Sequence, residues 1–300
     1  MNRFLWLVRR EVWEHKAIWV APAIVIGCLA LLVMTGNAHL GPLGDAGESH
    51  IFGDVPRETQ LRVLAIVYAG LALVVFMVMG IVAFFYSIDS LYADRRDRSV
   101  LFWKSLPLSD LETVLSKFAT AIIVIPLVAL AASAVAQLIV AAGGSARLAM
   151  NGLPGGLLWE PQALLGGFMA AFLWCLTAML WYSPIVGYLM LASAWAPRGP
   201  FLWAVLPPVG LWILERMVVG SEYVGDFITD RLFGLYRLLG EQSGGEVNRP
   251  GGDLEKIGSV DLVGSLRDFY ASPELWLGVA AAFLLLAGAM WVRRYRDETS

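Results

Sequence analysis

Six stretches of this sequence are long and apolar enough to cross a bilayer as helices. About 18 consecutive apolar residues suffice, because every backbone amide in lipid must bond within its own helix. Charged residues make up 16% of the 300 positions, against about 25% in soluble domains. We therefore predict an all-α integral membrane protein, a single transmembrane domain over residues 1–300, with six spans at 17–35, 63–90, 118–142, 163–196, 200–218 and 275–293.

The fourth span is longer than one crossing needs. Pro184 lies inside it, where the ring of a proline clashes with the preceding helical turn. We expect one span to about Ser183, followed by a kinked, still apolar continuation that reaches the cytoplasmic edge. Whether 184–196 continues the span or forms a re-entrant segment stays open.

The distribution of Lys and Arg predicts the orientation of the chain. Basic residues are retained on the cytoplasmic side, and they are concentrated near both termini and in 91–117. Both termini should therefore be cytoplasmic. The first span resembles a signal peptide only loosely, since Glu11 and Glu14 precede it and favour an uncleaved anchor.

The largest extracytoplasmic piece is then the loop 219–274, which should contain amphipathic helices. Apolar residues recur in it at helical spacing, and Gly240 is positioned to end that first helix. A second short helix should stop before Pro273. The apolar positions of the two helices are Val224, Phe227, Ile228, Leu232, Leu235 and Leu239, then Leu262, Leu266 and Phe269.

Residues 1–16 are predicted to form a helix that lies in the cytoplasmic headgroup region. Leu5, Val8 and Val12 fall on one side of such a helix, and basic residues fall on another. Trp6 and Trp13 suit the same environment. The basic residues assigned to this interfacial helix are Arg3, Arg9 and Arg10.

The segment 91–117 is the long charged connection on the cytoplasmic side, and it reads LYADRRDRSVLFWKSLPLSDLETVLSK. Ser109 and Glu112 form an S-x-x-E capping box, so a helix should start at Ser109. That helix can run without interruption into the third span, bent at most by Pro126. A push at its cytoplasmic start would therefore reach the bilayer.

This arrangement resembles the permease subunits of ABC-2 type exporters. In that family the connection after the second span commonly carries a tyrosine, an acid-arginine cluster, an aromatic residue, a Leu-Pro-x-Ser and a lysine. A second, looser similarity lies at 193–208, SAWAPRGPFLWAVLPP. The positions that match the connection are Tyr92, Asp94, Arg95, Arg96, Trp103, Leu106, Pro107, Ser109 and Lys117.

The resemblance implies a permease that works as a dimer, with itself or with a sister subunit, in a bacterial inner membrane. It implies a coupling helix around 99–107 that sits in a groove of a separate ABC ATP-binding subunit, which would hold ATP and magnesium. Lipid is the other expected partner; no nucleic acid and no cofactor of this chain are expected. The residues expected to contact the ATP-binding subunit are Arg95, Arg96, Arg98, Phe102, Trp103, Lys104, Leu106 and Pro107.

Other classes of membrane protein fit less well. The glycines of GPLGDAGES at 41–49 lack the Lys-Ser/Thr pair of a P-loop, so we expect no ATP hydrolysis by this chain. We expect no metal site, because the three histidines share no helical face. The apolar cores of the spans lack the charges of an ion-coupled carrier and the nucleophile–base pair of an intramembrane enzyme. Gln137 is explained by an interhelical hydrogen bond.

One alternative remains beside the exporter permease. A membrane scaffold or assembly factor that transports nothing could dock a cytoplasmic partner through the same 91–117 segment. The sequence does not identify the cargo of a permease. A pathway lined by aromatic, aliphatic and small residues fits a lipid-like, peptide or amphipathic drug-like molecule better than a simple ion.

Overall fold

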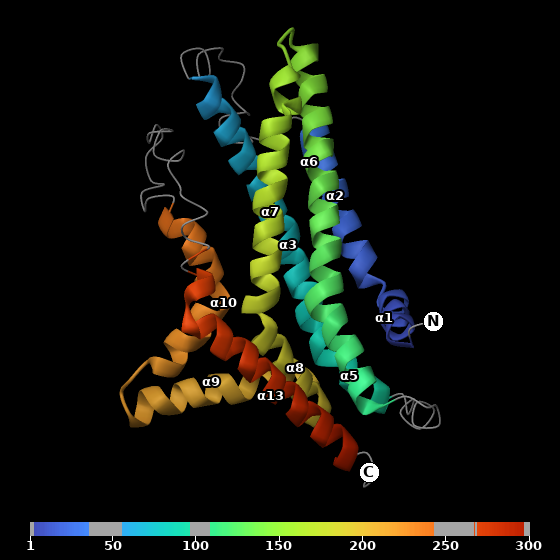
Figure 1. Ribbon diagram of the computed structural model, residues 1–300, viewed down its shortest axis with the longest axis vertical. Coiled ribbons are helices and arrows are strands. Elements are labelled where there is room, and N and C mark those ends of the chain that lie inside the picture. The colour runs from blue at the N-terminus through green and yellow to red at the C-terminus, as the bar shows by residue number, and fades with distance from the viewer. Residues whose placement is uncertain (1–2, 36–55, 97–108, 243–266, 268, 297–300) are drawn as a thin grey trace.

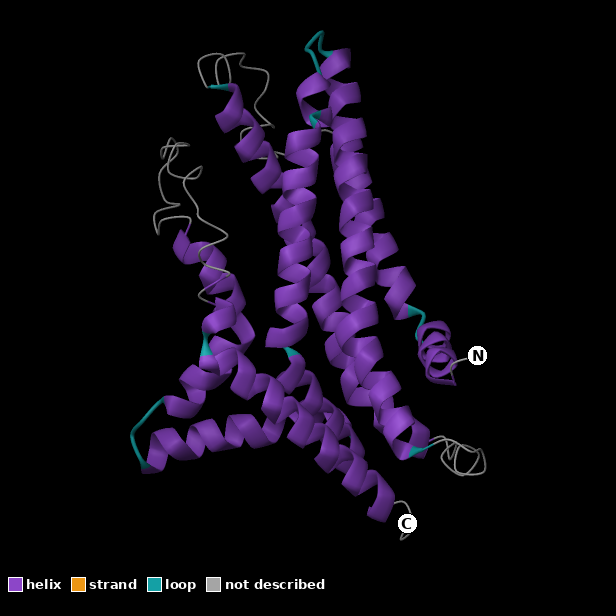
Figure 2. Cartoon of the chain, in the orientation of Figure 1, coloured by secondary structure: helices purple, strands orange, loops and turns teal. Residues whose placement is uncertain are grey.

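The computed structural model describes residues 3–35, 56–96, 109–242, 267 and 269–296. Every regular element in these residues is a helix, as Figure 2 shows, and six of the helices are long and apolar enough to cross a membrane. The predicted all-α, six-span class is thereby confirmed. The elements are α1 (Arg3–Glu14), α2 (Ala17–Thr35), α3 (Arg57–Arg96), α5 (Asp110–Ala119), η2 (Thr120–Val124), α6 (Ile125–Met150), η3 (Gly156–Trp159), α7 (Pro161–Trp181), α8 (Ser183–Trp195), α9 (Pro200–Val218), α10 (Tyr223–Gln242) and α13 (Pro273–Arg296).

Four long helices form an upright bundle. Figure 1 shows α2, α3, α6 and α7 running along the long axis of the molecule, and α3 packs against each of the other three. Helices α8 and α13 pack on each other and cross the lower end of this bundle obliquely. The first helix, α1, is viewed almost along its own axis in Figure 1, so it lies across the bundle rather than within it.

Small residues set the distance between α3 and α7. A Cβ atom added to Gly167 would lie 2.5 Å from the Cβ of Tyr68, closer than real Cβ contacts. Gly166 similarly faces Ala65. Tyr68 is fully buried, and its hydroxyl donates to the carbonyl of Leu158 at 2.8 Å. These small residues let α3 and α7 approach closely.

The third span is one long helix with a π turn in it. The capping box is present as predicted, because the Ser109 hydroxyl accepts from the Glu112 amide and the Glu112 carboxylate accepts from the Ser109 amide. Five residues, Thr120–Val124, then form the π turn, which the Ile125 amide closes by donating to Thr120. Pro126 follows at once. Its ring would crowd the carbonyl of Ile122 in an α-helix, so the wider turn relieves that clash.

The fourth apolar segment is broken where the sequence contains Pro184. Helix α7 ends at Trp181 and α8 begins at Ser183, so the proline stands in the first turn of a new helix. A proline is tolerated at that position because the first amides of a helix have no intrahelical acceptor. The segment therefore changes direction at Tyr182.

Helix α9 leaves the bundle sideways, and α10 turns back from it (Figure 1). Gly220 takes a positive φ of 71° in the turn, and the Glu215 carboxylate accepts from the amides of Tyr223 and Val224 to cap α10. Helix α10 continues to Gln242, so the prediction that Gly240 ends it is wrong. Ser272 separates the short helical stretch at 269–271 from α13.

The buried face of α10 also differs from the apolar positions in the sequence. Phe227 and Leu232 are exposed, whereas Arg231 is buried beside Leu235. The Arg231 guanidinium lies 4.3 Å from the ring centre of Trp181 and donates to the carbonyl of Glu274 at 2.6 Å. Burial lowers the pKa of Arg231, but an arginine stays charged at neutral pH. It fastens α10 to the junction of α7 and α13.

Candidate functional site

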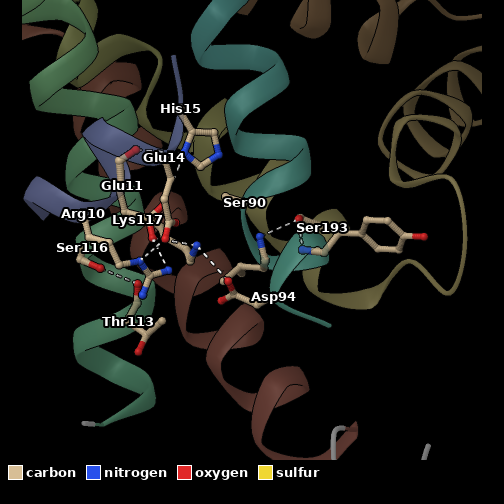
Figure 3. A network of polar contacts seen from close by, with 12 residues as sticks. Arg10, Glu11, Glu14, His15, Ser90, Asp94, Thr113, Ser116, Lys117 and Ser193 are labelled. Atoms are coloured by element: carbon tan, nitrogen blue, oxygen red, sulfur yellow. Dashed lines mark hydrogen bonds and ion pairs between the residues drawn. The ribbon is translucent and has the colours of Figure 1, made fainter. Parts of the chain in front are cut away.

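Four buried charged side chains from four helices meet at the end of the bundle where α3 ends and α5 begins. They are Glu11 of α1, Asp94 of α3, Lys117 of α5 and Arg293 of α13, with exposed fractions of 2%, 6%, 2% and 5%. Figure 3 shows Glu11, Asp94 and Lys117 pointing toward one another. We call these four residues the ion cluster.

Lys117 lies at the centre of the ion cluster. Its Nζ atom is 3.0 Å from Glu11 Oε1 and 3.4 Å from Asp94 Oδ1. A buried ammonium is stabilised only when acids and acceptors replace the water it has lost. The two carboxylates supply that compensation, and they tie α5 to both α1 and α3.

Arg293 extends the ion cluster to the last helix. Its Nη1 atom is 3.0 Å from Asp94 Oδ2, and its Nε atom is 3.2 Å from Asp110 Oδ1. One planar guanidinium thus bridges two acids through two different nitrogen atoms, whereas a lysine has only one nitrogen to offer. Because Asp94 and Asp110 lie on the two helices that flank residues 97–108, Arg293 joins both flanks of that segment to α13.

Glu11 is held by further groups around the ion cluster. The Tyr86 hydroxyl donates to Glu11 Oε2 at 3.0 Å, and the His15 ring meets the Tyr86 ring edge-on at 4.6 Å. Arg10 pairs with Glu11 at 3.3 Å and with Glu14 at 2.9 Å. Helix α1 is therefore attached through its acids as well as through its apolar residues.

The end of α8 is fastened to the end of α3 beside the ion cluster. The Ser193 hydroxyl accepts from the amides of Leu91 and Tyr92 at 3.1 and 3.0 Å (Figure 3). Arg95 donates to the carbonyls of Ser193 and Ala196 at 2.6 and 3.0 Å. A guanidinium at the last carbonyls of α8 also suits the negative end of the helix dipole.

The residues expected from the sequence to bind an ATP-binding subunit fall into two groups. Arg95 is engaged with α8, and the exposed Arg96 lies 3.6 Å from Asp89. Both guanidiniums lie over the ring of Tyr92. The other expected contacts lie outside the described residues: Arg98, Phe102, Trp103, Lys104, Leu106 and Pro107.

The first helix is present, but its packed face differs from the sequence expectation. Leu7, Glu11 and Val12 are buried, while Leu5 is 63% exposed. Of its basic residues, Arg3 and Arg9 are exposed, and the guanidinium of Arg9 lies over the rings of Trp6 and Trp13. Arg10 is half-buried in the pairs described above. The location of α1 at the membrane surface remains a prediction.

Reasoning from the sequence missed the ion cluster. Asp94 and Lys117 were singled out only for their match to a family pattern, and Arg293 only as a basic residue near the end of the chain. One signal was available: Glu11 falls one helical turn after Leu7, on the face that packs. An acid on a packed face calls for a buried cation. The sequence does not reveal which cation that is.

Part of the chain matches a known family. Residues 61–150, which run from α3 through the connecting segment to the end of α6, match the family described as ABC-2 family transporter protein. No curated protein and no solved structure matches the chain. The matched region contains Asp94, Asp110 and Lys117, and it confirms the resemblance noted in the sequence.

The six apolar helices support a multi-pass membrane protein, and the family match relates residues 61–150 of it to transporter proteins. Residues 61–150 are therefore similar to the ABC-2 family of transporter proteins, and they lie in a chain with six helices that are long and apolar enough to cross a membrane.

Proposed function

We propose that this chain is the permease subunit of an ATP-driven exporter, working as a dimer with itself or with a sister subunit. Two separate ATP-binding subunits would dock on the 97–108 segment and carry ATP and magnesium. The membrane would be a bacterial inner membrane, with both chain termini in the cytoplasm. The direction of transport follows from the family resemblance.

The observation that carries this proposal is the position of the ion cluster. Asp94 precedes the 97–108 segment, whereas Asp110 and Lys117 follow it. Lys117 pairs with Glu11 and Asp94, and Arg293 pairs with Asp94 and Asp110. Breaking a buried ion pair by removing one partner costs about 3–5 kcal/mol. The ends of α1, α3, α5 and α13 should therefore move as one body when that segment is pushed.

The force would reach the bilayer through the third span. Helix α5 continues into α6 through the π turn at 120–124, and its first turn is fixed by the capping box. ATP-driven closure of the partner subunits would shift this helix and α3 together. The dimer would then pass between closed and outward-open arrangements.

The test is copurification of a partner. The chain, tagged and extracted gently, should carry an ABC-type ATP-binding subunit in equal amount, as two copies of each chain by native mass spectrometry. Replacing Phe102 and Trp103 by Ala should remove the partner. A matched control is Trp159→Ala with Phe227→Ala, an exposed aromatic pair on η3 and α10, which should retain it.

Uncoupling can be tested on the purified complex. Trp103→Ala combined with Arg98→Glu should abolish ATP-driven transport without lowering the unfolding temperature of the chain. Unchanged complex formation and transport in that variant would overturn the proposal. A chain that captures no ATP-binding subunit in any mild detergent would point instead to a membrane scaffold.

A further inference from the structure

An apolar cavity of about 460 Å³ lies among α3, the π turn, α6, α7 and α8, and Leu232 of α10 also lines it. Its volume falls in the range of about 300–1,000 Å³ that is usual for small-molecule sites. The lining consists of described residues, and none of them carries a charged side chain. The aromatic side chains of the lining are Phe76, Phe84, Phe85, Trp174 and Tyr182.

The lining determines which molecules the cavity can accept. A charged ligand would lose its water there without gaining a partner, so it is disfavoured. The rings of Phe76 and Trp174 pack on each other in the lining, with their centres 5.3 Å apart and their planes tilted by 35°, and such aromatic surroundings suit an aromatic ligand. Met77, Met79 and Met179 add flexible thioethers that adapt to different shapes.

The cavity also shares a wall with the π turn. Ala121 and Ile122 of η2 line it, and so do Ile125 and Pro126 just after that turn. These residues lie on the same continuous helix that begins at Ser109 and bears Lys117 of the ion cluster. A molecule in the cavity would therefore contact the helix that receives the motion of the 97–108 segment.

We propose that this cavity binds the cargo, and that the cargo is an uncharged, largely apolar molecule of drug size that carries an aromatic ring. The proposal rests on the exporter function and names its substrate class. The five aromatic side chains of the lining favour such a molecule over a flexible acyl chain. An acyl chain of the surrounding bilayer is the competing occupant, and the experiment separates the two.

The chain offers a matched pair of variants on a single helix. Gly80 of α3 lines the cavity, and a Cβ atom added to it would meet nothing within 4 Å, so the side chain of Gly80→Leu starts from open space. Gly70 of the same helix is equally open but does not line the cavity. Both substitutions replace a helical glycine by a better helix former. Gly70→Leu is therefore the control.

The experiment uses the full chain alone in lipid nanodiscs, labelled by an uncharged phenyldiazirine and analysed by peptide mass spectrometry. We expect saturable labelling of residues that line the cavity, such as Met79, Ile122 and Trp174. Excess N-phenylnaphthylamine should displace the label. Labelling should fall about tenfold in Gly80→Leu, as expected for a loss of about 1.4 kcal/mol of binding free energy, and stay unchanged in Gly70→Leu.

Two results would overturn this proposal. One is labelling that does not saturate, or that is equal in the Gly80→Leu and Gly70→Leu chains. The other is labelling of the same residues by a photoactivatable phosphatidylcholine that N-phenylnaphthylamine does not displace, which would assign the cavity to an acyl chain. No ATP-binding subunit is present in this experiment, so its outcome is independent of the copurification that tests the exporter function.

Discussion

Arg293 places its Nη1 atom 3.0 Å from Asp94 Oδ2, although the two residues are 199 positions apart in the sequence. The same guanidinium reaches Asp110. The last helix is thus bonded to the final turns of the second span and to the first turn of the third. The helix ends on either side of residues 97–108 are thereby joined to α13, and the Lys117–Glu11 pair joins them to α1.

Lys117→Met should destabilise the chain strongly. The substitution leaves Glu11 and Asp94 buried beside an uncharged side chain, and losing one partner of a buried ion pair costs about 3–5 kcal/mol. The unfolding temperature of the chain in detergent should fall clearly. Arg57→Met is the control, since Arg57 is 72% exposed and pairs with Glu160 at the surface, where an ion pair is worth about 0–1 kcal/mol. Equal unfolding temperatures for the two variants would contradict the account.

A double-mutant cycle should detect the bond between Asp94 and Arg293. Asp94→Asn and Arg293→Met each remove one partner, so the combined loss should be smaller than the sum of the single losses. We expect a coupling of about 1–3 kcal/mol in the free energy of unfolding. The cycle of Asp94→Asn with Arg57→Met should be additive. If both cycles were additive, the Asp94–Arg293 contact would contribute nothing to the free energy of unfolding.

Gly167→Ala should separate α3 from α7. The added Cβ atom would lie 2.5 Å from the Cβ of Tyr68, and overpacking of this kind costs about 1–3 kcal/mol. Gly27→Ala on α2 meets nothing within 4 Å and should be neutral or stabilising. The unfolding temperatures of the two variants decide the matter. A Gly167→Ala chain as stable as Gly27→Ala would refute the close approach.

Ser109→Ala should fray the start of α5. The serine hydroxyl accepts from the Glu112 amide at 3.1 Å, and loss of such a cap costs about 1 kcal/mol. Hydrogen exchange of the amides in 110–113 should become faster. Ser145→Ala removes a hydroxyl inside α6 and should leave these amides unchanged. If both variants left them unchanged, the capping box would not hold the helix start.

Local patterns in the sequence predicted much of the fold. The spans follow from apolar length, and the start of α5 follows from the Ser109–Glu112 spacing. Gln137 was expected to bond between helices, and its amide donates to the carbonyl of Tyr68 at 3.4 Å. The spans and the helix start depend on residues that are close in sequence, whereas the partner of Gln137 lies 69 positions away and is identified only by the structure.

The tertiary pairing of charges could not be predicted in this way. Each member of the ion cluster stands at the edge of an apolar run or in α1, where a charge is usually solvated. Arg231 is a similar case, because apolar periodicity assigned the packed face of α10 to Phe227 and Leu232. A guanidinium can replace an apolar residue there only because the ring of Trp181 and the carbonyl of Glu274 receive it. Such partners become visible only in three dimensions.

The measurement that tests the central claim most directly is hydrogen exchange on the chain in complex with its ATP-binding subunit, compared with and without a non-hydrolysable ATP analogue. The account predicts that exchange changes together in the 109–124 stretch and in α1, which the ion cluster joins. Residues 156–165 at the opposite end of the bundle, around η3 and the start of α7, serve as an internal reference. A change confined to 97–108, with α1 and 109–124 unaffected, would contradict transmission through the ion cluster.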